Sequence, residues 1–425
     1  MAQQTSALWK ALIRERNTEK EYAFDINGVW YGSEAEVSHS VEASLFESFG
    51  IGNAMSATLS LSLYAEDIPR GAVIKRYVRL VNGSRTSEWL PKGEFFINRR
   101  VSEDGLWSLE AYDAMLKADI TWTPKITFPC TMEAAARDIA AAMGVDLDER
   151  NVYLPYTMDA YPEGEYMRRD ALRDIAAAHG GNWIISDEGK LRLIPLISFP
   201  AETDYLVTQY GDAILFGGTR ILLSTQGGGQ PGASEGDQFY VGLDLISCED
   251  NGKRPAVTSV TFQMDGEDTV TAGTYTGLDL YAVCPYATQE MATAILTQTR
   301  GYQYQAFSAE SANIDPAMEL GDAVTVGNLY GVISAIKDNG DGYPSLFAPG
   351  EEELEDEYPY RSATQRELTG DVDTLRAFIQ KSLGAMQIEL NSMKADIQQM
   401  TQTLQQISNK VTELDSRVTA LEGGS

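Results

Sequence analysis

About fifty residues at the end of the chain carry the pattern that most constrains its fold. Apolar residues recur there at alternating steps of three and four positions, in two columns that extend beyond the three or four heptads typical of a coiled coil. One column holds Leu383, Leu390, Ile397, Leu404, Val411 and Val418, and the other holds Met386, Met393, Met400, Ile407, Leu414 and Leu421. A single helix cannot bury such a seam, so we expect residues 363–425 to form a coiled-coil rod with partner helices.

The residues beside the seam predict how these helices are oriented. Glu389 meets Lys394 of a neighbouring helix, and Lys410 meets Asp415, when the helices are parallel and in register. The seam places Leu and Val in the first column with Met, Ile and Leu in the second, and it contains no Asn to enforce a dimer. This composition favours a parallel trimer, and a dimer remains the alternative.

The charge balance narrows the range of partners. The 425 residues include 62 acidic and 33 basic ones, which gives a net charge of −29. Such a chain repels duplex DNA and anionic membranes, so we predict no specific nucleic-acid binding. Two interpretations stay open: the charge keeps an abundant assembly soluble, or it forms an acidic inner surface that DNA passes without binding.

The sequence predicts neither a membrane span nor secretion. No run approaches the roughly eighteen apolar residues of a spanning helix, and residues 1–20 lack the apolar core of a signal peptide. Cys130, Cys248 and Cys284 are far apart and odd in number, which favours buried, reduced thiols over disulfides. We therefore expect the protein to be made in the cytoplasm.

Changes in periodicity divide the chain into domains of an α+β, mainly β, fold class. The predicted order is an N-terminal arm or short helix at 1–19, a first tube-like antiparallel β-barrel at 20–124, a small α+β domain at 125–199, a second β-barrel at 200–362 with a Gly-rich loop at 224–237, and the coiled-coil rod at 363–425.

Local signals define several elements inside these domains. Asn27-Gly28 predicts a tight hairpin turn, and residues 55–65 alternate polar and apolar side chains as a half-buried strand does. Thr131 as N-cap and Gly144 as stop bound a predicted helix. Two further helices are predicted at about 166–179 and 288–300, and a hairpin is predicted with its turn at 187–190.

The sequence contains no recognisable catalytic or metal-binding pattern. His39 and His179 are its two histidines, and there is neither a zinc-spaced Cys/His cluster nor a Gly-x-Ser-x-Gly elbow. His179 ends a predicted helix, where an imidazole commonly caps carbonyl groups. Residues 338–342 (DNGDG) place glycines at calcium-ligand positions, so a hairpin turn is predicted there. We predict no catalytic, cofactor-binding or metal-binding residues, and a structural role.

Three segments carry a recognisable pattern: residues 93–119, 172–195 and 313–349, which include Ala111-Tyr112-Asp113-Ala114-Met115 and Leu320-Gly321-Asp322. These segments resemble the tail-tip or baseplate hub proteins of tailed phages and of related contractile particles. The similarity in pattern extends over most of residues 20–360.

The resemblance implies a homotrimeric virion protein of the tail tip or baseplate. In that family, two tube-like barrels per chain form a pseudo-sixfold ring, which docks onto the hexameric tail tube and leaves a channel for DNA or an effector. The rod is then expected to join a tip, spike or fibre protein, or to plug the tube. Many relatives continue into a peptidase or lysozyme domain; this chain departs from that pattern, so no enzymatic activity is carried over to it.

Two other functions remain as alternatives. A trimeric receptor-binding or fibre adhesin would also contain a coiled coil, but it predicts a C-terminal knob or repeated β-segments, and neither is present. A cell-wall hydrolase would need converging acid and base groups, which the sequence alone does not reveal.

Overall fold

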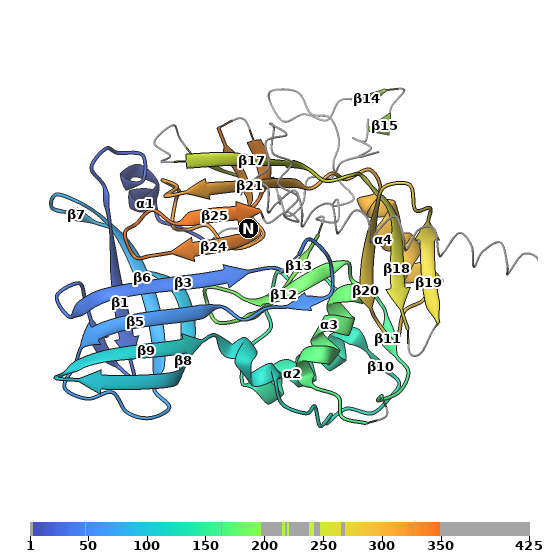
Figure 1. The fold of residues 1–425 in the computed structure, drawn as a ribbon, viewed down its shortest axis with the longest axis horizontal. Helices are drawn as coiled ribbons and strands as arrows, with labels where there is room; N and C mark the ends of the chain where they lie inside the picture. Colours follow the sequence, from blue (N-terminus) through green and yellow to red (C-terminus); the bar gives the residue numbers. More distant parts are fainter. Residues whose placement is uncertain are drawn as a thin grey trace, which may run out of the picture. The chain divides into compact units, whose positions relative to one another are not determined.

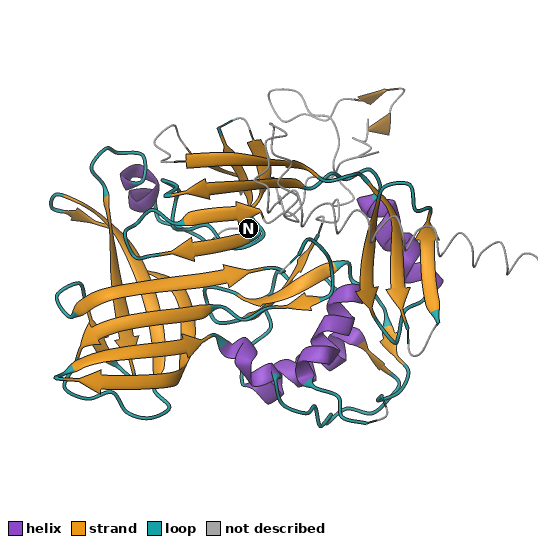
Figure 2. Ribbon diagram, viewed as in Figure 1, coloured by secondary structure: helices purple, strands orange, loops and turns teal. Residues whose placement is uncertain are grey.

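A computed structural model describes residues 3–46, 48–162, 164–196, 215–216, 219–220, 238–241, 247–264, 268–327 and 329–348. Strands predominate and helices are few (Figure 2), so the chain is mainly β, as predicted. Residues 1–353 form one compact unit. The predicted rod lies outside the described residues, and the coiled coil stays a prediction.

Helices α2 (Met132–Met143), α3 (Arg168–Ala178) and α4 (Gln289–Thr299) lie close to their predicted positions. Helix α1 (Ala7–Leu12) lies within the predicted N-terminal arm or short helix, and the 3₁₀ helix η1 (Ala114–Ala118) was not predicted. The Thr131 side chain accepts a hydrogen bond from the Ala134 amide at the start of α2, and Gly144 ends this helix in the left-handed conformation. Both predicted caps of α2 are confirmed.

One large, curled antiparallel sheet runs through the unit (Figure 1). Its strands follow one another in the order β17 (Ser247–Lys253), β21 (Gln305–Glu310), β25 (Ser345–Ala348), β24 (Ala335–Asp338), β3 (Glu36–Ser44), β5 (Thr58–Tyr64), β9 (Leu106–Tyr112), β8 (Leu90–Glu103), β6 (Val73–Asn82), β1 (Glu19–Ile26) and β2 (Val29–Tyr31), with β7 (Arg85–Thr86) beside β6.

Alternating side chains explain the first part of this sheet. In β5, Leu59, Leu61 and Leu63 are buried, and the residues between them are exposed or half-buried. These leucines belong to a hydrophobic core formed by strands of the first predicted β-domain. The β1–β2 turn at Asn27-Gly28 has positive φ at both residues, as a tight hairpin turn requires, so this prediction is also confirmed.

The joining of the two predicted β-domains was not foreseen. Strand β24 of the second domain pairs with β3 of the first, so strands from both lie in one sheet. Strands β17, β21 and β25 of the second domain lie in this sheet as well, and its other described strands form smaller sheets. The predicted antiparallel pairing is wrong for β16 (Gln238–Val241) with β22 (Ala323–Val326) and for β18 (Val257–Gln263) with β20 (Leu278–Val283), which are parallel. Alternation of side chains fixes the face that a strand buries, but not its neighbour.

Smaller sheets complete the unit. They are β10 (Cys130–Thr131) with β11 (Thr157–Met158); β13 (Leu191–Pro195), β12 (Gly181–Ile185) and β4 (Asn53–Ala54); β14 (Leu215–Phe216) with β15 (Thr219–Arg220); β16 (Gln238–Val241), β22 (Ala323–Val326) and β23 (Leu329–Val332); and β19 (Thr269–Gly273), β18 (Val257–Gln263) and β20 (Leu278–Val283).

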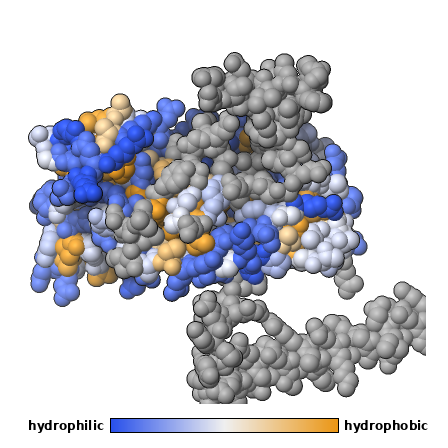
Figure 3. Space-filling view, turned by 90° about the horizontal axis from the view of Figure 1, so that it is seen from above, coloured by the Kyte–Doolittle hydropathy of each residue, from blue (hydrophilic) through white to orange (hydrophobic). Residues whose placement is uncertain are grey.

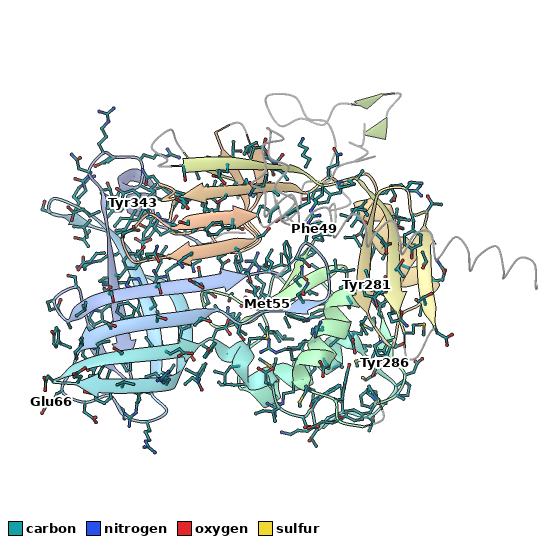
Figure 4. The ribbon with its side chains drawn as sticks, viewed as in Figure 1. Phe49, Met55, Glu66, Tyr281, Tyr286 and Tyr343 are labelled. Atoms are coloured by element: carbon teal, nitrogen blue, oxygen red, sulfur yellow. The ribbon has the colours of Figure 1, made fainter. Side chains whose placement is uncertain are left out.

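A second, larger core unites the α+β region with the second β-domain. It includes residues of α2, α3, the β12–β13 hairpin, β18 and α4. Phe49, labelled in Figure 4, stacks on Tyr304 with ring centroids 4.3 Å apart, and Tyr286 donates a 2.9 Å hydrogen bond to the Ala160 carbonyl. Since this core crosses the predicted boundary near residue 199, the two regions pack as one body.

The surface and helices agree with the charge pattern of the sequence. On the face drawn in Figure 3, hydrophilic residues cover much of the described surface, and hydrophobic residues form small groups among them. Among the helices that the structure describes, none is long and apolar enough to span a membrane.

Candidate functional site

The pairing of β24 with β3, which we call the joint, connects the two β-domains. Four residue pairs form it, from Ala335 opposite Ser44 to Asp338 opposite Val41. Lys337 Nζ lies 2.7 Å from Glu42 Oε1 directly across the two strands, and both side chains are about half exposed. Backbone hydrogen bonds and a cross-strand ion pair thus hold the domains edge to edge.

A buried charged cluster anchors one end of the joint. The Arg76 guanidinium of β6 pairs with the Asp338 carboxylate of β24, and only 2 % of the Arg76 side chain is exposed. Tyr22 of β1 donates a 3.3 Å hydrogen bond to the same carboxylate, and its ring centroid lies 4.6 Å from the guanidinium carbon. A buried charge of this kind is tolerated only with such partners.

The charges in this cluster shift the pKa values of its members. Burial favours the neutral form of Asp338, but Arg76 and the hydrogen bonds outweigh burial and lower the pKa of Asp338 to about 2. Burial and the Asp338 charge raise the pKa of Tyr22. Asp338 is therefore ionised at neutral pH, and Tyr22 remains a hydrogen-bond donor.

His39 of β3 belongs to the same cluster. Its Nε2 lies 3.0 Å from Arg76 Nη2, and its Nδ1 contacts the Glu36 carboxylate. Because arginine can only donate, Nε2 accepts, and Nδ1 carries the hydrogen that is donated to Glu36. Gly340 follows the joint at φ +77°, and a side chain there would meet the His39 ring at 2.5 Å. This position therefore requires glycine.

The turn after β24 also packs on the first β-domain. Lys20 Nζ of β1 donates a 2.5 Å hydrogen bond to the Gly342 carbonyl and lies 5.3 Å from the Tyr343 ring centroid (Figure 4). Burial lowers the pKa of Lys20 to about 8. The predicted hairpin turn at 338–342 is confirmed: β24 and β25 flank it, and Gly340 N donates to Asp338 Oδ1 at 3.0 Å.

A second charged cluster ties the α+β region to the second β-domain. Glu319 Oε2 accepts hydrogen bonds from Arg150 Nη1 at 2.5 Å and from Arg192 Nη1 at 2.8 Å. Asp148 Oδ2 accepts from Arg150 Nη2 at 2.6 Å. Glu319 and Asp148 are each only 3 % exposed. The two buried carboxylates thus accept hydrogen bonds from the two guanidinium groups, which offsets the cost of burying their charges.

The three regions meet at Lys92. This residue of β8 pairs with Asp187, in the turn of the β12–β13 hairpin, and donates a 2.9 Å hydrogen bond to the Met318 carbonyl. Beside it lies a cavity of about 70 Å³, into which Asp113 and Glu94 also face. Burial raises the pKa of Asp113 to about 7. Because drug-sized ligands need roughly 300 Å³ or more, this cavity is too small for such a ligand.

The structure describes some of the residues singled out in the sequence and not others. The seam residues from Leu383 to Leu421 lie outside the described residues, as do Glu389, Lys394, Lys410 and Asp415, so their roles stay predictions. His179 ends α3, and its Nδ1 lies 2.8 Å from the Ile175 carbonyl, which confirms its capping role.

The expectation of buried thiols is correct only in part. Cys284 is buried, Cys130 is partly exposed, and Cys248 is exposed on the edge strand β17. All three cysteines are free, as the sequence predicted, but their spacing does not determine how deeply each is buried. In the part of the chain that the structure describes, no group of three or more His, Cys, Asp or Glu side chains could hold a metal ion.

Sequence reasoning missed the two charged clusters. Arg76 lies between the buried residues Ile74 and Val78 on the inward side of β6. A charge at an inward position of an alternating strand signals a buried partner. That signal was present, although it could not identify Asp338.

Comparisons with known proteins found similarity only at the level of structure. No protein-family model and no curated protein matches the sequence. Similar structures are the 43 kDa tail protein of prophage MuSo2 from Shewanella oneidensis (12% identity, TM-score 0.44, 77% of this chain, 97% of that chain) and the tail protein from Neisseria meningitidis MC58 (10%, 0.43, 77%, 95%). A third is the prophage tail protein gp18 from Listeria monocytogenes EGD-e (12%, 0.42, 78%, 95%). TM-scores below 0.5 do not establish a common fold or function.

Proposed function

We propose that this chain is a structural protein of a phage-type tail, and more specifically the homotrimeric hub of its tip or baseplate. In this role it adapts a sixfold tail tube to a threefold tip or fibre, and it forms part of the channel for DNA or an effector. It acts by holding other components in place and not as an enzyme.

The heptad seam supports the threefold symmetry. Residues 383–421 carry the a/d repeat, and the pairs Glu389–Lys394 and Lys410–Asp415 attract each other in a parallel, in-register bundle. Without a seam Asn, and without β-branched residues throughout the first column, the sequence favours three helices over two.

The joint is the observation that carries the hub proposal. It fixes two β-domains of one chain side by side in a single sheet, and the Arg76–Asp338 cluster holds them together. The Arg150–Glu319 cluster holds the second β-domain to the α+β region. Three such chains present six β-domains around one axis, which is the number a hexameric tube requires. The resemblance of residues 93–119, 172–195 and 313–349 to tail hub proteins supports the same arrangement.

This proposal defines the partners. The chain binds two further copies of itself, a tail-tube or distal tail protein at the β-domains, and a tip, spike or fibre protein at the rod. It resides in the virion after synthesis in a bacterial cytoplasm. Its net charge of −29 supports passage of DNA past the ring without specific binding.

Light scattering on the purified protein tests the trimer. The expected mass of the full chain is three times 46.6 kDa. A second protein that stops at Tyr360 separates the contributions: a fall toward the monomer mass shows that the rod holds the trimer. A trimer that survives truncation shows that the β-domains associate by themselves. A dimer would exclude the threefold hub.

A further inference from the structure

Three aromatic rings gather on the outer face of the first β-domain, and we call them the aromatic platform. They are Trp30 of β2, Tyr77 of β6 and Trp89, which directly precedes β8. The ring centroids of Trp30 and Tyr77 lie 5.1 Å apart, with ring planes inclined by 32°, and those of Trp30 and Trp89 lie 5.3 Å apart, edge to face. Trp30 is 47 % exposed, and the other two residues are half-buried. Aromatic rings grouped at a surface mark an interaction site.

The strand register places these rings on the outer face. Buried residues of β6 alternate with Tyr77 and Arg79, so these two side chains point away from the core. Ala23 of β1 is directly opposite Tyr77, and Trp30 of β2 is directly opposite Asp25. Ala23 is fully buried, although it is part of none of the hydrophobic cores that the described residues form. The rings themselves therefore shield it from water.

Neighbouring side chains hold the platform in place. Arg79 Nε donates a 2.7 Å hydrogen bond to Glu21 Oε2, and the guanidinium carbon of Arg79 lies 4.4 Å from the Trp89 ring centroid. A cation over the face of an indole is an attractive contact. Trp89 in turn meets Trp30 edge to face. The rings are thus arranged before a ligand arrives, which reduces the entropy that binding costs.

The charges beside the platform argue against a nucleic acid as its ligand. Aromatic rings also stack on nucleobases, but sites of that kind lie in positively charged grooves. Here Arg79 is paired with Glu21, and Lys75 Nζ lies 3.6 Å from Glu94 Oε2. Neither cation is therefore free to neutralise a phosphate. The chain as a whole, with its net charge of −29, repels a polyanion.

The platform is also small for a protein partner. A protein interface of standard size covers about 800 Å² per partner, with few charged residues at its centre. Here Asp25 is opposite Trp30, and the Arg79–Glu21 pair contacts Trp89. Apolar rings bordered directly by hydrogen-bonding groups suit a small, neutral ligand that has both apolar faces and hydroxyl groups.

We propose that the aromatic platform binds a neutral saccharide, a chain of β-linked pyranose units with equatorial hydroxyl groups. The flat faces of such units carry C–H groups, which pack on the rings of Trp30 and Tyr77. Hydroxyl groups at the rim of each unit donate hydrogen bonds to the carboxylates of Glu21 and Asp25 and accept them from Arg79. This binding activity goes beyond the proposed hub role and needs no trimer.

Isothermal titration calorimetry of the full chain tests the proposal with two probes, a short β-linked oligomer of glucose and one of N-acetylglucosamine. At least one of them should bind. Trp30→Ala removes a stacking ring and should weaken this binding about tenfold, whereas Trp30→Phe keeps a ring and should weaken it less. The matched control is Tyr281→Ala, which removes a 54 % exposed ring of β20, in a different sheet (Figure 4), and should leave the affinity unchanged.

Three outcomes overturn the proposal. The first is that neither oligosaccharide binds, and the second is that Trp30→Ala and Tyr281→Ala bind equally well. The third is that a single-stranded oligothymidylate binds through Trp30, which would assign the platform to a nucleic acid. Light scattering distinguishes this proposal from the hub: saccharide binding by a chain that stays monomeric supports the platform and overturns the hub.

Discussion

At the scale of single residues, the Arg76–Asp338 pair has the largest predicted effect on stability. Asp338→Asn leaves the Arg76 charge buried without its carboxylate, which costs about 3–5 kcal/mol of unfolding free energy. The control Lys337→Gln removes the Lys337–Glu42 ion pair of the same strand. Both side chains of this pair are about half exposed, so its loss should cost at most about 1 kcal/mol of unfolding free energy. Urea unfolding measures both. Equal losses would show that the cluster contributes no more than a surface pair.

The same carboxylate predicts a pH dependence. Since the pKa of Asp338 is about 2 in the folded chain and about 4 when unfolded, the folded state favours the ionised form. Its contribution of about 2 kcal/mol is complete above about pH 4 and is lost as the pH falls through about 2. The stability difference between the natural protein and Asp338→Asn should therefore shrink from pH 5 to pH 2. A constant difference would contradict the assignment.

At the scale of elements, the N-cap of α2 can be tested directly. Thr131→Ala removes the acceptor for the Ala134 amide and should cost about 1 kcal/mol. Thr157 is directly opposite Thr131 in the β10–β11 pair and is also exposed, but it caps no helix. Thr157→Ala should therefore change stability by less than about 0.5 kcal/mol. Chemical unfolding of both variants decides whether the hydroxyl acts as a cap.

Elements were predictable where their signals are local. The cap residues of α2 and the Asn27-Gly28 turn act within a few positions, so the sequence defines them. The joint could not be predicted from local signals, because β3 and β24 are nearly three hundred residues apart in the sequence. The alternation of side chains in one strand does not specify the other strand as its neighbour. The Arg76–Asp338 cluster depends on that pairing, so it could not be assigned before the structure.

At the scale of the whole molecule, the proposed hub depends on two features of the chain. The joint holds the two β-domains of one chain in a single sheet. The heptad seam predicts that a rod holds three such chains together.

The seam can be tested without shortening the chain. Leu404→Asp places a charge in the predicted core of the bundle, whereas Gln402→Asp adds the same charge at an outward position two residues earlier. A buried, unpaired charge in every copy should raise the concentration of half-dissociation by at least about tenfold, and the outward charge should change it little. Light scattering over a dilution series measures both. Equal dissociation of the two variants would show that residues 383–421 do not form the predicted seam.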